Sequence, residues 1–335
     1  MARDNRIDSI KGLLIILVIM GHVITTFDNQ NVVNHAVMGF LYSFHMPLFI
    51  FISGYLSKNS SQQSPRDLWR GAFNLFFTLV IFHFLCSLRI ELCGASFMAA
   101  MKIFPFGVLW YLLSLIYWRV TLYYTPKPLL RRPALYLGIA LALSILIGLS
   151  YLGNPFALQR SANFFFFFLL GYYFRQGALP ARWWNNITLH AIVALVTLPL
   201  LFWLFPHCGG FMNGADHYRV EDIPEKILVL SCSTSMLILL FHFVKDHPVL
   251  RYYGKTSMFH YMYHYFIIGM VLQPVIKRYD LPVTFPFVIL YTLVILITLY
   301  GMSKVKIFTW AVEPVLKRPK KESRPSQTES PELKS

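Results

Sequence analysis

The feature that most constrains this chain is a succession of apolar runs that are separated by short polar or Pro/Gly-containing segments. Most runs are close to the length of about 20 apolar residues that a helix needs to cross a bilayer. The sequence therefore predicts an all-α polytopic membrane protein with about ten transmembrane helices. The expected helices are 7–27, 36–56, 71–90, 105–123, 134–152, 162–175, 186–206, 226–244, 257–276 and 283–302.

Composition excludes a water-soluble fold. Of the 335 residues, 56% are hydrophobic and only 13% are charged, whereas soluble domains carry about 25% charged residues. The formal charge of +15 does not indicate a nucleic-acid partner in such a chain, because the cytoplasmic loops of membrane proteins collect Lys and Arg. The bilayer itself is therefore the expected partner of this surface.

The distribution of Lys and Arg predicts the orientation of the chain. With a cytoplasmic N-terminus, 23 of the 30 basic residues fall on the inside and 7 on the outside, which is the bias expected of short cytoplasmic loops. Ten spans then place both termini in the cytoplasm. The first apolar run is expected to be a span and not a cleaved signal, because further spans follow it at once and no small-residue cleavage site follows it.

Two polar segments complete the expected organisation. Residues 1–304 form the predicted transmembrane domain, within which 207–225 are the longest outer loop, rich in Gly and acids. Residues 305–335 form a basic cytoplasmic tail, and 316–335 are too rich in Pro, Ser, Lys and Glu to bury a core. The tail's first basic residues suit the anionic inner leaflet.

The first helix carries two ionisable groups on one face. Lys11 and His22 are eleven residues apart, which is three helical turns and about 20°, or about 16 Å along the axis. Asp8 lies near the same stripe, three residues before Lys11. Ionisable groups inside a membrane span point to function, although a snorkelling Lys and a His bonded to a neighbouring helix remain an open alternative.

The second helix places His45 at a depth that can match that of His22 when it enters from the outer side. Pro47 frees the carbonyl group four residues before it and favours a kink near His45. Ser53 and Gly54 form a small pair that permits close helix approach. Packing alone also accounts for this pair.

The ninth helix carries His260 and His264, which share a face at i and i+4 spacing. No Asp or Glu accompanies them in an HExxH pattern, so no metal site is expected. His83 in the third helix has no supporting motif and is expected to be a hydrogen-bonded core residue. The chain's four cysteines show no metal spacing and are expected to pack in the core.

Three segments together resemble the acyltransferase-3 family of integral membrane acyltransferases, in particular its fucose 4-O-acetylase-like branch. The family's first-helix pattern is a basic residue followed, after ten residues, by a His. Lys11 and His22 match this pattern. FHMPLFIFISGYL at 44–56 and GKTSMFHYMYHYF at 254–266 match the second-helix and late motifs, and WYLLSL at 110–115 and FLLGYYFR at 168–175 are weaker echoes. Family members often carry two basic residues and a Pro near the start of the third helix, whereas here only Arg70 fits.

The resemblance implies a fold and a reaction for the chain. It implies a multi-pass protein of the bacterial inner membrane that moves an acyl group, most often acetyl, from cytoplasmic acyl-CoA to a hydroxyl of a cell-envelope glycan or a lipid-linked sugar. Inner-mouth residues Lys11 and Arg70, with Ser53, are then expected to bind the acetyl-CoA donor. His22, His45 and His264 are the expected catalytic residues, with His22 as a general base or a transient acyl carrier.

Two other function classes fit the same features. A polysaccharide or small-solute exporter would also have basic, His-lined membrane cavities, although no matched pair of Gly/Pro-broken spans is visible. A non-catalytic sensor or assembly subunit is the third class. Release of free thiol from acetyl-CoA distinguishes the enzyme from both.

Overall fold

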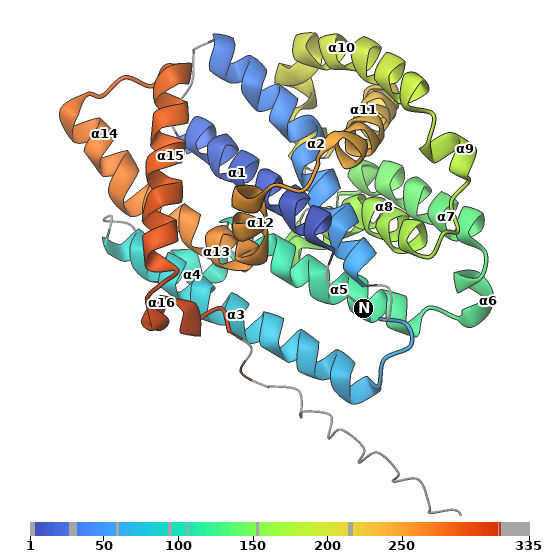
Figure 1. The fold of residues 1–335 in the computed structure, drawn as a ribbon, viewed down its shortest axis with the longest axis horizontal. Helices are drawn as coiled ribbons and strands as arrows, with labels where there is room; N and C mark the ends of the chain where they lie inside the picture. Colours follow the sequence, from blue (N-terminus) through green and yellow to red (C-terminus); the bar gives the residue numbers. More distant parts are fainter. Residues whose placement is uncertain are drawn as a thin grey trace, which may run out of the picture.

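The computed structural model describes residues 4–26, 32–57, 60–92, 96–105, 107–151, 154–213, 217–313 and 315, and within these ranges it contains helices and loops but no strand. Short 3-10 turns join some of the helices, and a π-helical turn, η5 (Ile268–Leu272), follows α13. The α-helices, labelled in Figure 1, are α1 (Asn5–Thr26), α2 (Val32–Leu56), α3 (Pro65–Leu92), α4 (Phe97–Lys102), α5 (Trp110–Tyr124), α6 (Lys127–Leu130), α7 (Pro133–Leu146), α8 (Leu158–Arg175), α9 (Ala181–Trp184), α10 (Ile187–Asn213), α11 (Ile223–Phe243), α12 (Pro248–Lys255), α13 (Ser257–Ile267), α14 (Gln273–Tyr279), α15 (Phe285–Met302) and α16 (Lys306–Trp310).

Each expected membrane segment contains a helix, which confirms an all-helical polytopic membrane protein. In the described part of the chain, six helical segments are long and apolar enough to cross a bilayer, and the number of ten spans stays a prediction. The six segments are Asn5–Thr26, Ala36–Leu56, Pro65–Glu91, Phe97–Tyr124, Val220–Phe243 and Phe285–Met302.

The boundaries differ from expectation by several residues at a number of helices; α3, for example, begins at Pro65 and not at 71, and α5 begins at Trp110 and not at 105. The predicted helix 162–175 begins earlier, because α8 starts at Leu158. The predicted loop 207–225 is wrong at its beginning, because α10 continues through Pro206 to Asn213. Proline does not have to end a helix in a membrane, since neighbouring groups can satisfy the freed backbone carbonyl.

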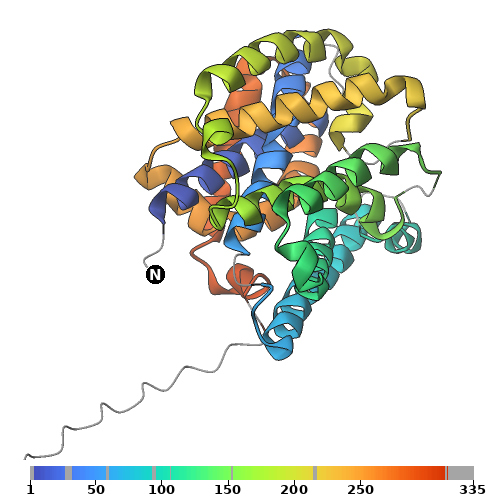
Figure 2. The same cartoon turned by 90° about the vertical axis from the view of Figure 1, so that its right-hand side faces the viewer.

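α1 lies in the middle of the helix assembly. It contacts α2 on one side and α12, α13 and α15 on the other, and α2 in turn contacts α8, α10 and α11 (Figure 1). Seen from the side, the long helices form several overlapping layers around α1 and α2 (Figure 2). The first two helices therefore connect the C-terminal group of helices with the central group.

Glycine allows α1 and α12 to cross in close contact. A Cβ atom added to Gly12 would lie 1.8 Å from the Leu250 carbonyl oxygen, and one added to Gly254 would lie 1.7 Å from the Asp8 carbonyl oxygen. Only a hydrogen atom fits at either position. Gly254, from the GKTS motif, thus fixes where α1 meets the helices that follow it.

A second glycine pair holds α2 against α8. Added Cβ atoms at Gly54 and Gly171 would each lie 1.9 Å from a backbone oxygen of the other helix, that of Phe168 or Phe51. Gly54 belongs to the second-helix motif and Gly171 to the FLLGYYFR segment. These two glycines fix the position of α2, the helix that carries His45.

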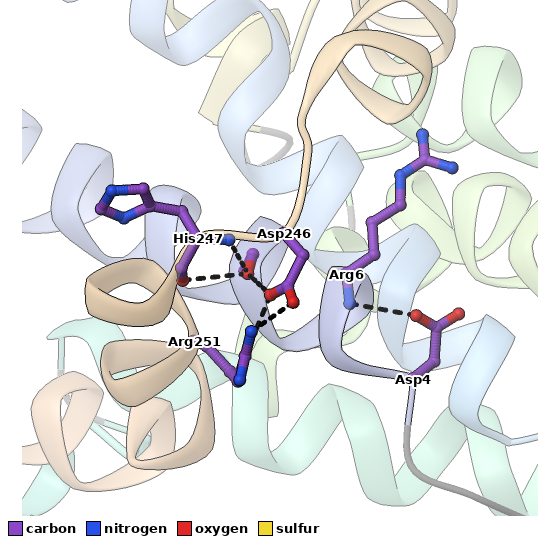
Figure 3. A network of polar contacts seen from close by, with 6 residues as sticks. Asp4, Arg6, Asp246, His247 and Arg251 are labelled. Carbon is purple, nitrogen blue, oxygen red and sulfur yellow. Dashed lines mark hydrogen bonds and ion pairs between the residues drawn. The ribbon is translucent and has the colours of Figure 1, made fainter.

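The N-terminal end of α1 is tied to the segment between α11 and α12 (Figure 3). The Ser9 hydroxyl donates to the Asp246 carboxylate at 2.9 Å and accepts from the His247 backbone N–H at 3.0 Å. Arg251 forms an ion pair with Asp246. Arg6 points away from this group and donates to the Val244 carbonyl at 2.9 Å, at the end of α11.

The predicted tail begins with a short helix. The Phe308 carbonyl in α16 accepts a hydrogen bond of 2.9 Å from the Tyr263 hydroxyl in α13. Residue 314 and residues 316–335 lie outside the described residues. The boundary between a domain at 1–304 and a tail at 305–335 stays a prediction.

Candidate active site

A cavity of about 430 Å³ lies beside the last turns of α1. Two of the three predicted catalytic histidines, His22 and His45, line it. Its wall is a mixture of polar, aromatic and small residues, contributed by α1, α2, α3, the 3-10 turn η1 (Gly107–Leu109), α5, α8, α13, η5 and α14. The lining residues are Val18, His22, Thr25, Thr26, Tyr42, His45, Met46, Arg89, Gly107, Val108, Trp110, Arg160, Phe164, Tyr261, Tyr265, Ile268, Gly269 and Gln273.

The backbone around Pro47 explains how His45 is held. Proline has no N–H, so it leaves the Ser43 carbonyl without its helical donor. The Ser233 hydroxyl of α11 donates to that carbonyl at 2.5 Å, and α2 continues as one helix through Pro47. The neighbouring helix thus satisfies the freed carbonyl next to His45.

A hydrogen bond fixes the tautomer of His45. Its Nδ1 lies 2.5 Å from the Leu41 carbonyl oxygen. A carbonyl oxygen can only accept, so the neutral ring carries its proton on Nδ1 and leaves the lone pair on Nε2. The Tyr42 ring packs edge-on at 4.9 Å from the His45 ring. His45 can therefore accept a proton or a hydrogen bond through Nε2.

The third predicted histidine, His264, contacts His22 directly. The two ring centroids are 5.1 Å apart, with the planes tilted by 42°. Nδ1 of His264 lies 3.1 Å from the His260 carbonyl oxygen, so this nitrogen carries the proton in the neutral ring. Nε2 of His264 is buried, with no hydrogen-bond partner among the described residues. An acceptor nitrogen therefore lies next to His22.

His260 and His83 do not line the cavity. Nδ1 of His260 lies 2.9 Å from the Thr256 carbonyl, and its ring packs edge-on against Tyr253. Nε2 of His83 lies 3.3 Å from the Met101 carbonyl. In the part of the chain that the structure describes, no group of three or more His, Cys, Asp or Glu residues is arranged to hold a metal.

The three predicted donor-binding residues do not line the cavity either. The Lys11 ammonium forms an ion pair with Asp8 at 3.2 Å, three helical turns from His22. Arg70 forms an ion pair with Asp67 at 3.0 Å in the first turns of α3. The Ser53 hydroxyl is buried and lies 2.5 Å from the Tyr111 hydroxyl.

An aromatic group separates Ser53 from the cavity. The Tyr111 ring lies 5.5 Å from the Tyr261 ring, and Tyr261 in turn lies 5.9 Å from His264. The Tyr261 hydroxyl donates to the Val108 carbonyl at 2.5 Å. Ser53 thus contacts Tyr111, which packs against Tyr261, and Tyr261 packs against His264.

Two arginines that no sequence motif singles out also line the cavity. The Arg89 guanidinium lies over the Tyr265 ring at 4.9 Å, and that of Arg160 over the Trp110 ring at 5.4 Å. From the sequence, both are expected only among the seven basic residues of the outer side. The sequence signal that could have identified them is their position at the ends of apolar helices, at the same expected membrane depth as the outer half of α1.

The fold and the cavity define a class of protein: a multi-pass helical membrane protein with a His- and Arg-lined cavity next to its first helix. The chain matches the acyltransferase-3 description "Acyltransferase domain" over residues 4–301, and it belongs to that family. It is therefore a membrane acyltransferase.

One curated relative is similar over a short stretch. It is Nodulation protein NolL of Sinorhizobium fredii (strain NBRC 101917 / NGR234), which is 43% identical over 61 residues. This stretch covers 17% of the present chain and 17% of the relative, so the chain spans only a small part of that protein's length. No solved structure matches the chain.

Proposed function

We propose that this protein is an inner-membrane O-acyltransferase, most simply an O-acetyltransferase. It takes the acyl group of cytoplasmic acyl-CoA and places it on a hydroxyl of a cell-envelope glycan or of its lipid-linked sugar precursor. The observation that carries the proposal is the contact between His22 and His264 at the wall of a cavity that His45 also lines. The family membership supports the acyl transfer itself.

In the proposed reaction, His22 removes the proton of the acceptor hydroxyl as the oxygen attacks the thioester carbonyl carbon. The carbon–sulfur bond then breaks, and the His22 imidazolium returns the proton to the departing thiolate. Coenzyme A leaves as a free thiol, and the acceptor carries an ester. A neutral imidazole is the form that this step needs.

His264 and His45 have supporting roles in this proposal. The Nε2 lone pair of His264 can accept an N–H from His22, which would leave the other His22 nitrogen as the base. His45, whose Nε2 is also an acceptor, lines the same cavity and can orient the hydroxyl. Neither role requires a metal ion.

The donor is proposed to approach from the end of the molecule where α1 begins. Lys11 and Arg70 lie toward that end, and cations are suited to the phosphates of coenzyme A. Their present partners, Asp8 and Asp67, would have to share them with the donor. Ser53, whose hydroxyl lies beside that of Tyr111, is proposed to bind the part of acyl-CoA that carries the acyl group.

The test is thiol release from acetyl-CoA by the purified protein in detergent, with extracted cell-envelope glycans and lipid-linked sugars added as acceptors. The wild-type protein should release free thiol, and His22→Gln should lower the rate by about 10²–10⁴-fold while still binding acetyl-CoA. His83→Gln, a buried histidine away from the cavity, is the matched control and should keep wild-type turnover. If the wild-type protein bound acyl-CoA but released no thiol, the proposal that it is an enzyme would be contradicted and an exporter would be favoured.

The same assay separates the two roles left open for His22. An acyl carrier releases about one thiol per protein in a burst when no acceptor is present. A general base without acceptor shows no burst. Comparison of cell-envelope glycans by mass spectrometry, with and without the gene, would identify the acceptor sugar and the acyl group.

A further inference from the structure

Arg89 is a buried cation at the wall of the cavity. Its exposed fraction is 9%, and its Nε is buried with no hydrogen-bond partner among the described residues. In the same residues, no carboxylate lies within ion-pair distance of it, and its guanidinium lies over the Tyr265 ring. A buried charge without a counter-ion is costly, so this position calls for an anion that is supplied from outside the chain.

The structure has a slot that holds this guanidinium in place. Gly269 belongs to the π-helical turn η5, and a Cβ atom added there would lie 1.5 Å from Nη1 of Arg89. Any other side chain at 269 would push the guanidinium out of its position. π-helical turns of this kind are rare and are often found at functional sites. Two elements far apart in sequence thus combine to place one cation.

The rest of the cavity wall is suited to an anion. Arg160 is a second lining cation, and no Asp or Glu is among the lining residues. Gln273 and Thr25 supply neutral hydrogen-bonding groups. Because His22 lines the same space, a ligand held by Arg89 would present its neighbouring atoms to the catalytic histidine.

We infer that the cavity takes an acidic acceptor, whose phosphate or carboxylate group binds Arg89 while a hydroxyl of the same molecule faces His22. A planar guanidinium pairs with either anion through two parallel hydrogen bonds. The inference rests on the proposed function, because it assigns the acceptor of that reaction. It makes Arg89 a specificity-determining residue.

Thermal unfolding of the purified protein in detergent tests this inference. The probes are glucose 1-phosphate, glucuronate and glucose at equal ionic strength, with inorganic phosphate as a fourth probe. At least one anionic sugar should raise the unfolding temperature of the wild-type protein more than glucose does. The larger of the two shifts shows whether phosphate or carboxylate is the recognised group.

Two variants connect the effect to the slot. Arg89→Gln should weaken binding of the anionic sugar by about ten- to a hundredfold and leave the response to glucose unchanged. Gly269→Ala should weaken it as well, although it leaves Arg89 in the chain. The matched control is Arg278→Gln, at an exposed position in α14 outside the cavity, which should bind like the wild-type protein.

Several outcomes would overturn the inference. One is a wild-type protein that none of the anionic probes stabilises more than glucose does. Another is an equal loss in Arg89→Gln and Arg278→Gln. A fall in affinity for coenzyme A in Arg89→Gln would assign Arg89 to the donor instead. Failure of the proposed function would look different. If the protein released no thiol but still bound the anionic sugar in an Arg89-dependent way, only the proposed reaction would be contradicted.

Discussion

The imidazole rings of His22 and His264 lie 5.1 Å apart, although one comes from the first helix and the other from the thirteenth. The Gly12–Gly254 crossing brings α1 against α12, the helix just before the one that carries His264. The family's first-helix and late motifs therefore meet in space at two levels. One level is a glycine contact between backbones, and the other is a pair of histidines.

His264 is expected to act through His22. His264→Ala should lower kcat by about 10–100-fold and leave the KM for acyl-CoA near the wild-type value, because His264 contacts His22 and not Lys11 or Arg70, which are proposed to bind the donor phosphates. His264→Asn should restore part of the activity, since a side-chain amide supplies both a hydrogen-bond donor group and an acceptor oxygen. Steady-state kinetics would check this split, with His83→Asn as the control. An unchanged kcat in His264→Ala would reduce this histidine to a packing residue.

Lys11 is expected to serve donor binding more than chemistry. Lys11→Ala should raise the KM for acyl-CoA by about tenfold or more and change kcat less, since a hydrogen bond to a charged group is worth about 1.5–3 kcal/mol. Lys11→Arg should be milder, because it keeps the charge that the phosphates need. Isothermal titration with acyl-CoA would measure the affinity. Wild-type affinity in Lys11→Ala would mean that Lys11 is only an interfacial anchor.

The sequence predicted the helices and the histidines because both depend on local signals. The length of an apolar run indicates a membrane helix, and a histidine within it is costly enough to be noticed. His22 and His45 accordingly line one cavity, and His264 touches His22. The motifs in which these residues occur lie within residues 4–301, the part of the chain that matches the family.

The position of Arg89 depends on contacts that no local pattern contains. Its guanidinium reaches the cavity only because η5 leaves space at Gly269, far along the chain. The ends of helices also differ from the prediction, as at α10, where glycines and acidic residues indicated a loop from 207 but the helix continues to Asn213. At Arg89, a neighbouring element decides the outcome.

The membrane topology can be tested directly. The bias of 23 inner to 7 outer basic residues predicts that reporters fused after residues 62, 128, 178 and 250 all report the cytoplasm. Paired alkaline phosphatase and fluorescent-protein fusions would provide opposite signals at each site. An outer-side signal at any two of the four sites would contradict ten spans with both termini inside.

The contact between Asp246 and Arg251 should make stability depend on pH only in acid. Hydrogen bonds from Arg251 are the main reason that the pKa of Asp246 lies below its ordinary value of 3.8, and the Ser9 hydroxyl adds to the effect. A carboxylate with a lowered folded-state pKa stabilises the protein above its unfolded pKa, and this stabilisation is lost as the pH falls through the folded-state pKa.

Asp246→Asn should therefore lower the unfolding temperature by a constant amount at neutral and mildly acidic pH. The difference from the wild-type protein should shrink as the pH is taken below 3.8, where the wild-type carboxylate is itself protonated. Thermal unfolding across a pH series would show this. The exposed Glu313→Gln is the control and should follow the wild-type curve. A difference that stays the same in strong acid would exclude the ionised carboxylate as its cause.

Gly254→Ala should destabilise the protein, because the added Cβ would lie 1.7 Å from the Asp8 carbonyl oxygen and force α1 and α12 apart. Overpacking of this kind costs about 1–3 kcal/mol. Gly138→Ala is the matched control, since nothing lies within 4 Å of its added Cβ and alanine favours a helix by up to about 1 kcal/mol. Unfolding temperatures in detergent should fall for the first variant and stay level or rise for the second.

Because the crossing also positions His22, Gly254→Ala should lower kcat at temperatures where it remains folded. If both variants had the same unfolding temperature, the close approach of α1 and α12 would not contribute to stability.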